Sequence, residues 1–172
     1  DGNSLAIDSA GKTLRRWPGF CESVAMVDDL ESAAPVSDLE SLRQALVLGI
    51  RDYAAKCGFR SAVLGLSGGI DSAVVACLAV EALGADKVTG VAMPSPFSSS
   101  HSVEDALQLA QNLGMPCLQI PIAESFEVFK AQMRPAFGDR PEDATEENMQ
   151  ARLRGLTLMS LSNSSRKASP SL

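Results

Sequence analysis

The stretch AVLGLSGGIDS, residues 62–72, joins a short apolar run to two adjacent glycines and then to an acidic residue. The apolar run 62–66 is typical of a buried parallel strand, because such strands are covered on both faces and need not alternate. The segment from Ile70 to Leu83 has helical character, and Gly84 is placed to end it. These residues therefore predict a strand, a glycine-rich turn and a helix in direct succession.

The rest of the chain repeats this alternation of strand and helix. Two more apolar runs predict strands at 88–93 and 117–122. Helices are predicted at 37–57, 70–83, 102–113, 126–137 and 146–161. Strands that alternate with helices indicate βαβ units, so the predicted fold class is α/β with a doubly wound parallel sheet.

The predicted helix ends rest on capping residues. Ser37 followed by Glu40 forms a capping-box pattern, and Thr145 is the expected N-cap of the last helix. Ser102 or a serine near it should cap the helix that ends at Gly114.

Composition limits the classes of protein that remain. The chain has 172 residues, of which 45% are hydrophobic, and a net charge of −6. This apolar fraction is too high for a disordered chain, and the acidic balance gives no footprint for binding nucleic acid. No apolar run reaches the ~18 residues of a membrane span and no signal-peptide pattern opens the sequence, so we expect a cytoplasmic chain without membrane partners. Cys77 and Cys117 lie in apolar segments and are predicted to be small core residues.

The turn at residues 67–72 has the features of an anion-binding loop. Its glycines let a phosphate approach the backbone, and the helix that follows directs free N–H groups at that phosphate. A carboxylate at Asp71 fits if it holds Mg²⁺, which bridges carboxylate and phosphate oxygens. The loop lacks the lysine of a Walker A motif and the third glycine of a dinucleotide fingerprint. The structural alternative is a glycine-rich turn in which Asp71 merely caps the helix.

The segment Ser67–Ser72 resembles the pyrophosphate-binding loop of the ATP pyrophosphatases. This resemblance implies a Rossmann-like adenine nucleotide α-hydrolase fold, with ATP as a substrate and Mg²⁺ held at Asp71. It also implies that ATP is bound by Gly65, Leu66, Ser67, Gly68, Gly69, Ile70, Asp71 and Ser72, with Met93 near the adenine.

The segments TEENMQARLRG (145–155) and LMSLSN (158–163) are similar to a stretch of glutamine-dependent NAD synthetases. The resemblance implies that nicotinic acid adenine dinucleotide is adenylated by ATP and then amidated to NAD, with nitrogen from glutamine or ammonia. Asn148 and Arg152 share one helical face and suit the nicotinate carboxylate or the dinucleotide pyrophosphate. No covalent nucleophile on the protein is expected, and the family resemblance implies a homodimer or larger assembly.

The resemblance also suggests how the chain is divided. Residues 1–36 resemble a remnant of a nitrilase-type amidase domain with its linker, and 37–163 resemble part of the synthetase ATP-binding domain, an incomplete sheet. The polar tail 164–172 looks like a truncation, so we expect the isolated chain to be inactive. Two alternatives stay open: another amidating ATP pyrophosphatase such as GMP synthetase, and a catalytically dead nucleotide-binding module.

Overall fold

The structure is a computed structural model that describes residues 2–26, 33–95, 99–138 and 140–167. The chain forms two compact units, Asp1–Cys57 and Gly58–Leu172, and each is described by itself. None of the helices in the described ranges is both long enough and apolar enough to cross a bilayer.

The first unit contains a hairpin and a helix. Strand β1 (Leu5–Ile7) pairs antiparallel with β2 (Thr13–Arg16). Asp8 closes the turn between them, because its Oδ1 accepts hydrogen bonds from the backbone N–H groups of Ala10 and Lys12, both at 2.9 Å. Helix α1 (Asp38–Lys56) follows later in the chain.

The start of α1 confirms one half of the predicted capping box. The Ser37 hydroxyl accepts a hydrogen bond from the Glu40 N–H at 3.2 Å. The Glu40 carboxylate turns instead to Arg43, at 2.6 and 2.8 Å, and to Gln44 at 2.7 Å. These hydrogen bonds, with Arg43 as the main contributor, lower the pKa of Glu40 to about 2. The pairing with the cation therefore competes with the second bond of the box.

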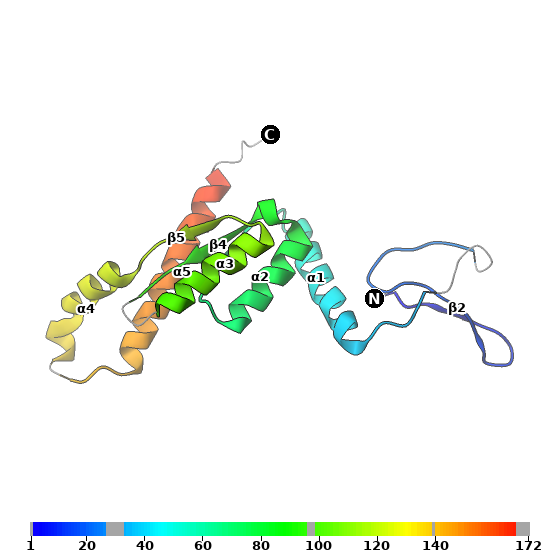
Figure 1. Ribbon diagram of the computed structural model, residues 1–172, viewed down its shortest axis with the longest axis horizontal. Coiled ribbons are helices and arrows are strands. Elements are labelled where there is room, and N and C mark those ends of the chain that lie inside the picture. Colours follow the sequence, from blue (N-terminus) through cyan, green and yellow to red (C-terminus); the bar gives the residue numbers. More distant parts are fainter. Residues whose placement is uncertain (1, 27–32, 96–98, 139, 168–172) are drawn as a thin grey trace. The chain divides into compact units, whose positions relative to one another are not determined.

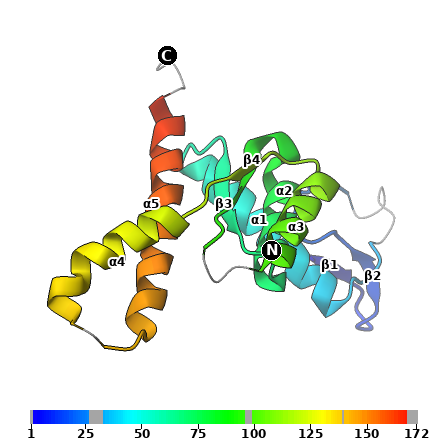
Figure 2. The same cartoon turned by 60° about the vertical axis from the view of Figure 1, so that its left-hand side comes forward.

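The second unit is an α/β structure with a three-stranded parallel sheet (Figures 1 and 2). Its strands lie in the order β3 (Ala62–Leu66), β4 (Val88–Ala92) and β5 (Cys117–Gln119). The helices of this unit are α2 (Ile70–Leu83), α3 (Ser100–Leu113), α4 (Ala123–Phe137) and α5 (Ala144–Lys167), with a short 3₁₀ helix at Ala85–Lys87.

Two apolar layers cover opposite faces of this sheet, so the doubly wound arrangement is confirmed. One layer contains Ala76 and Ala79 of α2, Ala106 and Ala110 of α3, and Leu66 of β3. The other is built on Val91, Met93 and Ile122, with Leu153, Leu158 and Leu161 of α5 packed against them. Figure 1 shows α2 and α3 together on one side of the strands and α5 on the other.

Strands β4 and β5 are shorter than predicted. They end at Ala92 and Gln119, ahead of Pro94 and Pro121, which have no N–H to donate to a ladder. The two backbone segments still run side by side beyond these strand ends. The Ile120 N–H donates to the Ala92 carbonyl and the Ile122 N–H to the Pro94 carbonyl, both at 2.9 Å. The two prolines thus end the regular strand pairing at the edge of the sheet where the candidate site lies.

Helix α5 begins at Ala144, two residues earlier than predicted, and Thr145 is not its N-cap. The Asp143 carboxylate accepts from the Thr145 N–H at 2.7 Å, and the Glu146 carboxylate accepts from the Asp143 N–H at 2.9 Å. Asp143 and Glu146 therefore form the capping box. The helix also continues to Lys167, beyond the predicted end near Leu161.

The expectation for Cys77 was wrong, because this side chain is exposed. Helix α2 turns its alanines toward the sheet, and Cys77 lies on the opposite face. Cys117 is partly buried against the α2 and α3 layer, and this burial raises the pKa of its thiol.

Helix α3, which contains Ser102, is capped by Ser99, one of the nearby serines, and ends at Gly114 as predicted.

Candidate functional site

The glycine-rich loop lies where β3 leaves the sheet and α2 begins. Two serine hydroxyls hold it in shape: Ser72 Oγ lies 3.1 Å from Ser67 Oγ and donates to the Gly69 carbonyl at 2.9 Å. Ser67 Oγ also accepts from the Gly69 N–H at 3.2 Å. The loop is therefore a small closed ring of hydrogen bonds, and the start of α2 is part of it.

Gly68 is the most constrained residue of this loop. Its φ is +79°, a left-handed conformation that side chains rarely adopt. A Cβ at this position would lie 2.3 Å from the Ser102 carbonyl oxygen, which is backbone and cannot turn aside. The loop thus packs directly on the first turn of α3, and only glycine fits the contact.

Asp71 lies in the first turn of α2 and is exposed. Among the described residues it has no hydrogen-bond or ion-pair partner, so its carboxylate is available. The N-cap of this helix is Gly69, which offers no side chain to its first amides. Free amides of this kind bind anions, and one carboxylate beside them is the usual protein contribution to a magnesium–phosphate site. The donor set therefore fits Mg²⁺ bound together with a phosphate.

Met93 occupies the core beneath the site. Its side chain is buried, and its Cε lies 3.0 Å from the place where a Cβ on Gly65 would be. The absence of a side chain at Gly65 makes room for this methionine. Only the backbone of Met93, at the carboxyl end of β4, is left as a candidate contact for adenine.

Asn148 and Arg152 come together on α5 as their spacing predicts. Arg152 Nη1 donates to Asn148 Oδ1 at 3.0 Å, and Asn148 Nδ2 donates to the Ala144 carbonyl at 2.8 Å. Both side chains are exposed. The pair is oriented by the helix itself and still offers guanidinium donors to a ligand.

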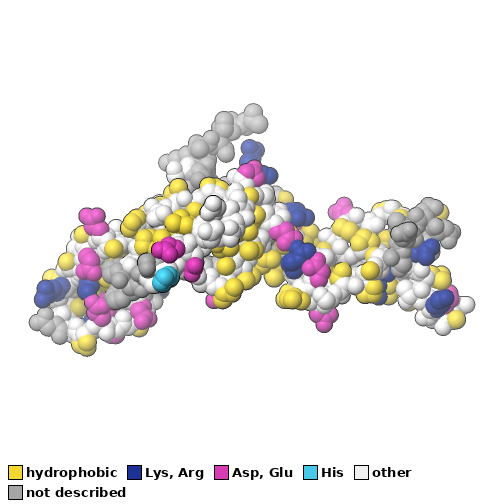
Figure 3. Space-filling model, in the orientation of Figure 1, with side chains coloured by type: hydrophobic (Ala, Val, Ile, Leu, Met, Phe, Trp, Pro, Cys, Tyr) yellow, Lys and Arg dark blue, Asp and Glu magenta, His cyan; other side chains and the backbone are white. Residues whose placement is uncertain are grey.

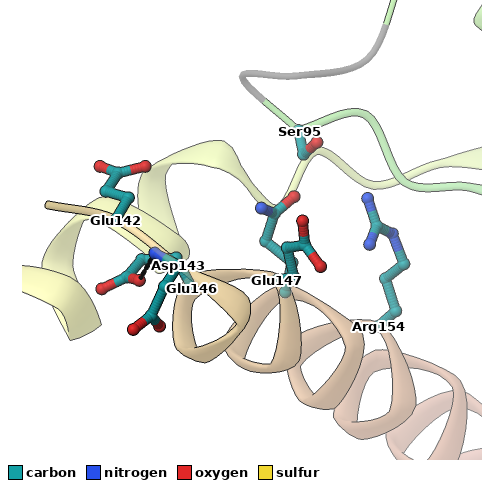
Figure 4. Close-up of a pocket in the computed structure, with 7 residues that line it drawn as sticks. Ser95, Glu142, Asp143, Glu146, Glu147 and Arg154 are labelled. Atoms are coloured by element: carbon teal, nitrogen blue, oxygen red, sulfur yellow. Dashed lines mark hydrogen bonds between the residues drawn. The ribbon is translucent and has the colours of Figure 1, made fainter.

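A cavity that the sequence analysis did not predict lies beside the end of β4 (Figure 4). Its volume is about 460 Å³. It is lined by Ser95, Glu142, Asp143, Glu146, Glu147, Gln150 and Arg154. One feature of the sequence could have indicated part of this lining. Residues 147, 150 and 154 have helical spacing, which places them on one stripe of α5, away from Asn148 and Arg152.

The wall of this cavity near the start of α5 is a network of ion pairs. Glu146 is only 5% exposed and receives hydrogen bonds from Arg140 at 2.7 and 3.3 Å. The Asp143 N–H, followed by Arg140, lowers the pKa of Glu146, and hydrogen bonds from Thr145 lower the pKa of Asp143. Lys130 pairs with Glu142, which raises the pKa of the lysine. Asp143 and Glu146 are therefore charged at neutral pH, and all three acids of this wall have a cationic partner.

The sequence model of the NAD synthase family matches residues 42–168, which include the glycine-rich loop and α5. The chain belongs to the NAD synthase family. Two of its curated relatives are glutamine-dependent NAD(+) synthetases, from Synechocystis and Thermotoga maritima. They are 49% and 50% identical to it over 95% and 87% of the chain. The chain spans 31% and 25% of the lengths of these two relatives.

Two solved structures of similar proteins share the fold. A glutamine-dependent NAD+ synthetase from Acinetobacter baumannii, in complex with ADP, has a TM-score of 0.90 at 39% identity, over 95% of this chain and 33% of that one. An NMN synthetase from Francisella tularensis has a TM-score of 0.67 at 31% identity, over 75% of this chain and 52% of that one. The same fold is thus found in two solved proteins that are named for different products.

Proposed function

We propose that this chain provides the ATP-binding part of an enzyme that converts nicotinic acid adenine dinucleotide to NAD. The observation that carries this proposal is the loop at the end of β3, with its free helix amides and with Asp71, which has no partner within the described ranges. Membership of the NAD synthase family and the ADP complex of the Acinetobacter relative support it.

In the proposed reaction the protein supplies positions and charges and forms no covalent bond to the substrate. A carboxylate oxygen of the nicotinate attacks the α-phosphorus of ATP, and pyrophosphate leaves. Ammonia, delivered as such or released from glutamine, then attacks the carbonyl carbon of the acyl-adenylate; AMP leaves, and one proton of the nitrogen is lost. Mg²⁺, when bound, neutralises charge on the phosphate oxygens. Holding the reactants in line lowers the entropic part of the barrier.

Each residue group has a proposed role in this scheme. The segment Gly65–Ser72 holds the phosphates through backbone amides and the two serine hydroxyls, and Asp71 holds the metal. The backbone of Met93 contacts the adenine. Arg152, oriented by Asn148, pairs with the carboxylate or pyrophosphate of the dinucleotide.

Substrate choice separates this proposal from its closest alternatives. We expect nicotinic acid adenine dinucleotide to bind the chain, and xanthosine monophosphate, the substrate type of GMP synthetases, not to bind. Nicotinic acid mononucleotide serves as a third ligand, because one structural relative is named an NMN synthetase. Saturation-transfer NMR with each ligand, on wild type and on Arg152→Met, measures the preference. Equal binding of all three ligands, unaffected by the substitution, would contradict the assignment of α5.

The 172 residues alone are expected to bind ATP and not to complete the reaction. Binding of the ATP phosphates needs only β3, the loop and the start of α2, which lie next to one another in the chain. Turnover requires that the charge on several oxygens is neutralised at the same time. The loss of one preorganised hydrogen-bond donor typically lowers the rate by a factor of about 10²–10³. Incubation with ATP, Mg²⁺, substrate and ammonium, followed by chromatography for AMP and NAD, tests this. Steady NAD formation would show that the catalytic set is complete here.

A further inference from the structure

The first turn of α3 supports the glycine-rich loop from outside. Gly68 approaches this turn so closely that a Cβ on it would lie 2.3 Å from the Ser102 carbonyl oxygen and 2.7 Å from the Ser102 Cα. Both are backbone atoms, so rotation of a side chain cannot adjust the contact. The position of the Ser102 backbone therefore limits where Gly68 can lie.

Ser99 holds the Ser102 backbone in place. It is the N-cap of α3, and its hydroxyl accepts a hydrogen bond from the Ser102 N–H at 3.2 Å. The hydroxyl oxygens of the two serines also lie 2.8 Å apart, within hydrogen-bond distance. Without a cap the first turn of a helix frays, because its leading N–H groups lose a partner. Ser99 is thus linked to Gly68 by two contacts, with Ser102 between them.

The start of α2 has less support of its own than the start of α3. Its N-cap is Gly69, which makes no side-chain hydrogen bond to the first turn. This leaves the amides free for a phosphate, but it also removes the contribution that a side-chain cap makes to their order. The hydrogen bonds of Ser67 and Ser72 shape the loop internally, and the contact with α3 adds a constraint from a second helix.

We propose that Ser99 is a positioning residue for the ATP phosphates. By capping α3 it fixes Ser102, and the Ser102 backbone keeps Gly68 and the amides that follow it in the arrangement that binds phosphate. The groups that contact the phosphates still come from β3, the loop and the start of α2, so loss of the cap should weaken binding without abolishing it. The inference rests on the proposed function, because it takes the loop as the phosphate site.

The first experiment measures the link between Ser99 and the loop without ATP. Hydrogen exchange of backbone amides is followed by ¹H–¹⁵N NMR in wild type, Ser99→Ala and Ser37→Ala. Ser37 caps α1 through the same contact, to the N–H three residues later at 3.2 Å, and is the matched control. The Ser67 and Gly69 amides, which both donate to serine hydroxyls of the loop, should exchange about fivefold faster in Ser99→Ala, the factor that corresponds to a typical lost serine cap. They should exchange at the wild-type rate in Ser37→Ala. Unchanged exchange of these two amides in Ser99→Ala overturns the proposal.

The second experiment measures ATP affinity by calorimetry, at a temperature at which circular dichroism shows each variant to be folded. Ser99→Ala should bind ATP about two- to fivefold more weakly than wild type, and Ser37→Ala should bind it equally well. Ser99→Asn exchanges one good N-cap for another and should restore the affinity. A loss shared by Ser99→Ala and Ser37→Ala would show general destabilisation, and a loss that Ser99→Asn does not rescue would show a direct contact of the hydroxyl with ATP; both overturn the proposal.

The two experiments together separate this inference from the proposed function. A wild-type chain that does not bind ATP would contradict the proposed function, and with it the role of Ser99 in ATP binding. Faster exchange of the loop amides in Ser99→Ala, combined with unchanged ATP affinity, would contradict the role of Ser99 alone.

Discussion

Gly68 is held by two independent constraints, its positive φ and its contact with the Ser102 backbone. Gly114 carries only the first constraint. Gly114, with φ +68°, has no atom within 4 Å of the position a Cβ would take. Comparing the two positions therefore separates the cost of the backbone conformation from the cost of the loop contact.

Gly68→Ala should cost more stability than Gly114→Ala and should also remove ATP binding. The left-handed conformation costs an alanine about 1–2 kcal/mol at either site. Only at Gly68 must the loop also move away from α3, which displaces the amides that bind phosphate. Thermal unfolding and ATP titration of both variants provide the measurement. A Gly68→Ala chain that binds ATP like wild type would contradict the role of the loop.

Asp71→Asn should weaken Mg-ATP binding far more than binding of ATP in excess chelator. An asparagine keeps the size of the side chain, but it loses the charge that holds a cation. Calorimetric titrations with and without Mg²⁺ separate the two effects. An equal loss in both conditions would show that Asp71 acts without a bound metal ion.

At the scale of elements, the start of α5 depends on ionised carboxylates. The hydrogen bonds of Asp143 and Glu146 lower the pKa of both groups, so the folded chain binds protons there less readily than the unfolded chain does. Their contribution to stability is present above the ordinary carboxyl pKa and is lost as the pH falls through the lowered folded value.

Glu146→Gln should therefore flatten the acid side of the stability profile. Wild type should lose stability steeply as the pH falls below about 4.5, while the variant starts less stable at pH 7 and loses less. Melting temperatures across this pH range measure the difference. Asp105→Asn, an exposed acid of α3 that makes no described contact, is the control and should follow wild type. Parallel profiles for wild type and Glu146→Gln would contradict the assignment.

The sequence predicted elements best where local residues alone decide their ends. Strand β3 and helix α2 were predicted to the residue, because the glycines of the loop and Gly84 leave no other boundary. The start of α5 was misplaced because Asp143 and Thr145 are both good caps. The choice between these two caps depends on the pairing of Arg140 with Glu146, which is a contact of the folded chain.

Neither the exposed face of α2 nor the cavity could be predicted from the sequence, and the reasons differ. Helix α2 is apolar at nearly every position, so periodicity could not distinguish its buried alanines from exposed Cys77. The cavity combines Ser95 with residues 142–154, which are far apart in the chain. Their proximity is a result of β4 and α5 packing against each other.

At the scale of the whole molecule, the exposed apolar side chains call for an explanation. They include Leu39, Leu42 and Tyr53 on α1, Val74 and Val75 on α2, and Leu156 and Met159 on α5. Figure 3 shows apolar side chains gathered across the face that carries α2. The exposed valines of α2 form apolar surface of the kind that is characteristic of interfaces, so we propose that the chain self-associates through α2.

Sedimentation velocity at micromolar concentration should therefore show a homodimer or a larger assembly. The double variant Val74→Glu/Val75→Glu places two charges on the exposed face of α2, where burying them against a second copy would require desolvation, and it should shift the distribution toward monomer. Gln108→Glu, on an exposed polar position of α3, adds a charge outside the apolar surface and should leave the distribution unchanged. Circular dichroism of each variant checks that its helices are retained.

A wild-type chain that sediments as a single monomeric species would contradict self-association. An assembly that resists the α2 substitutions would instead move the interface to α1 or α5, where Leu42→Glu and Met159→Glu test each helix in turn.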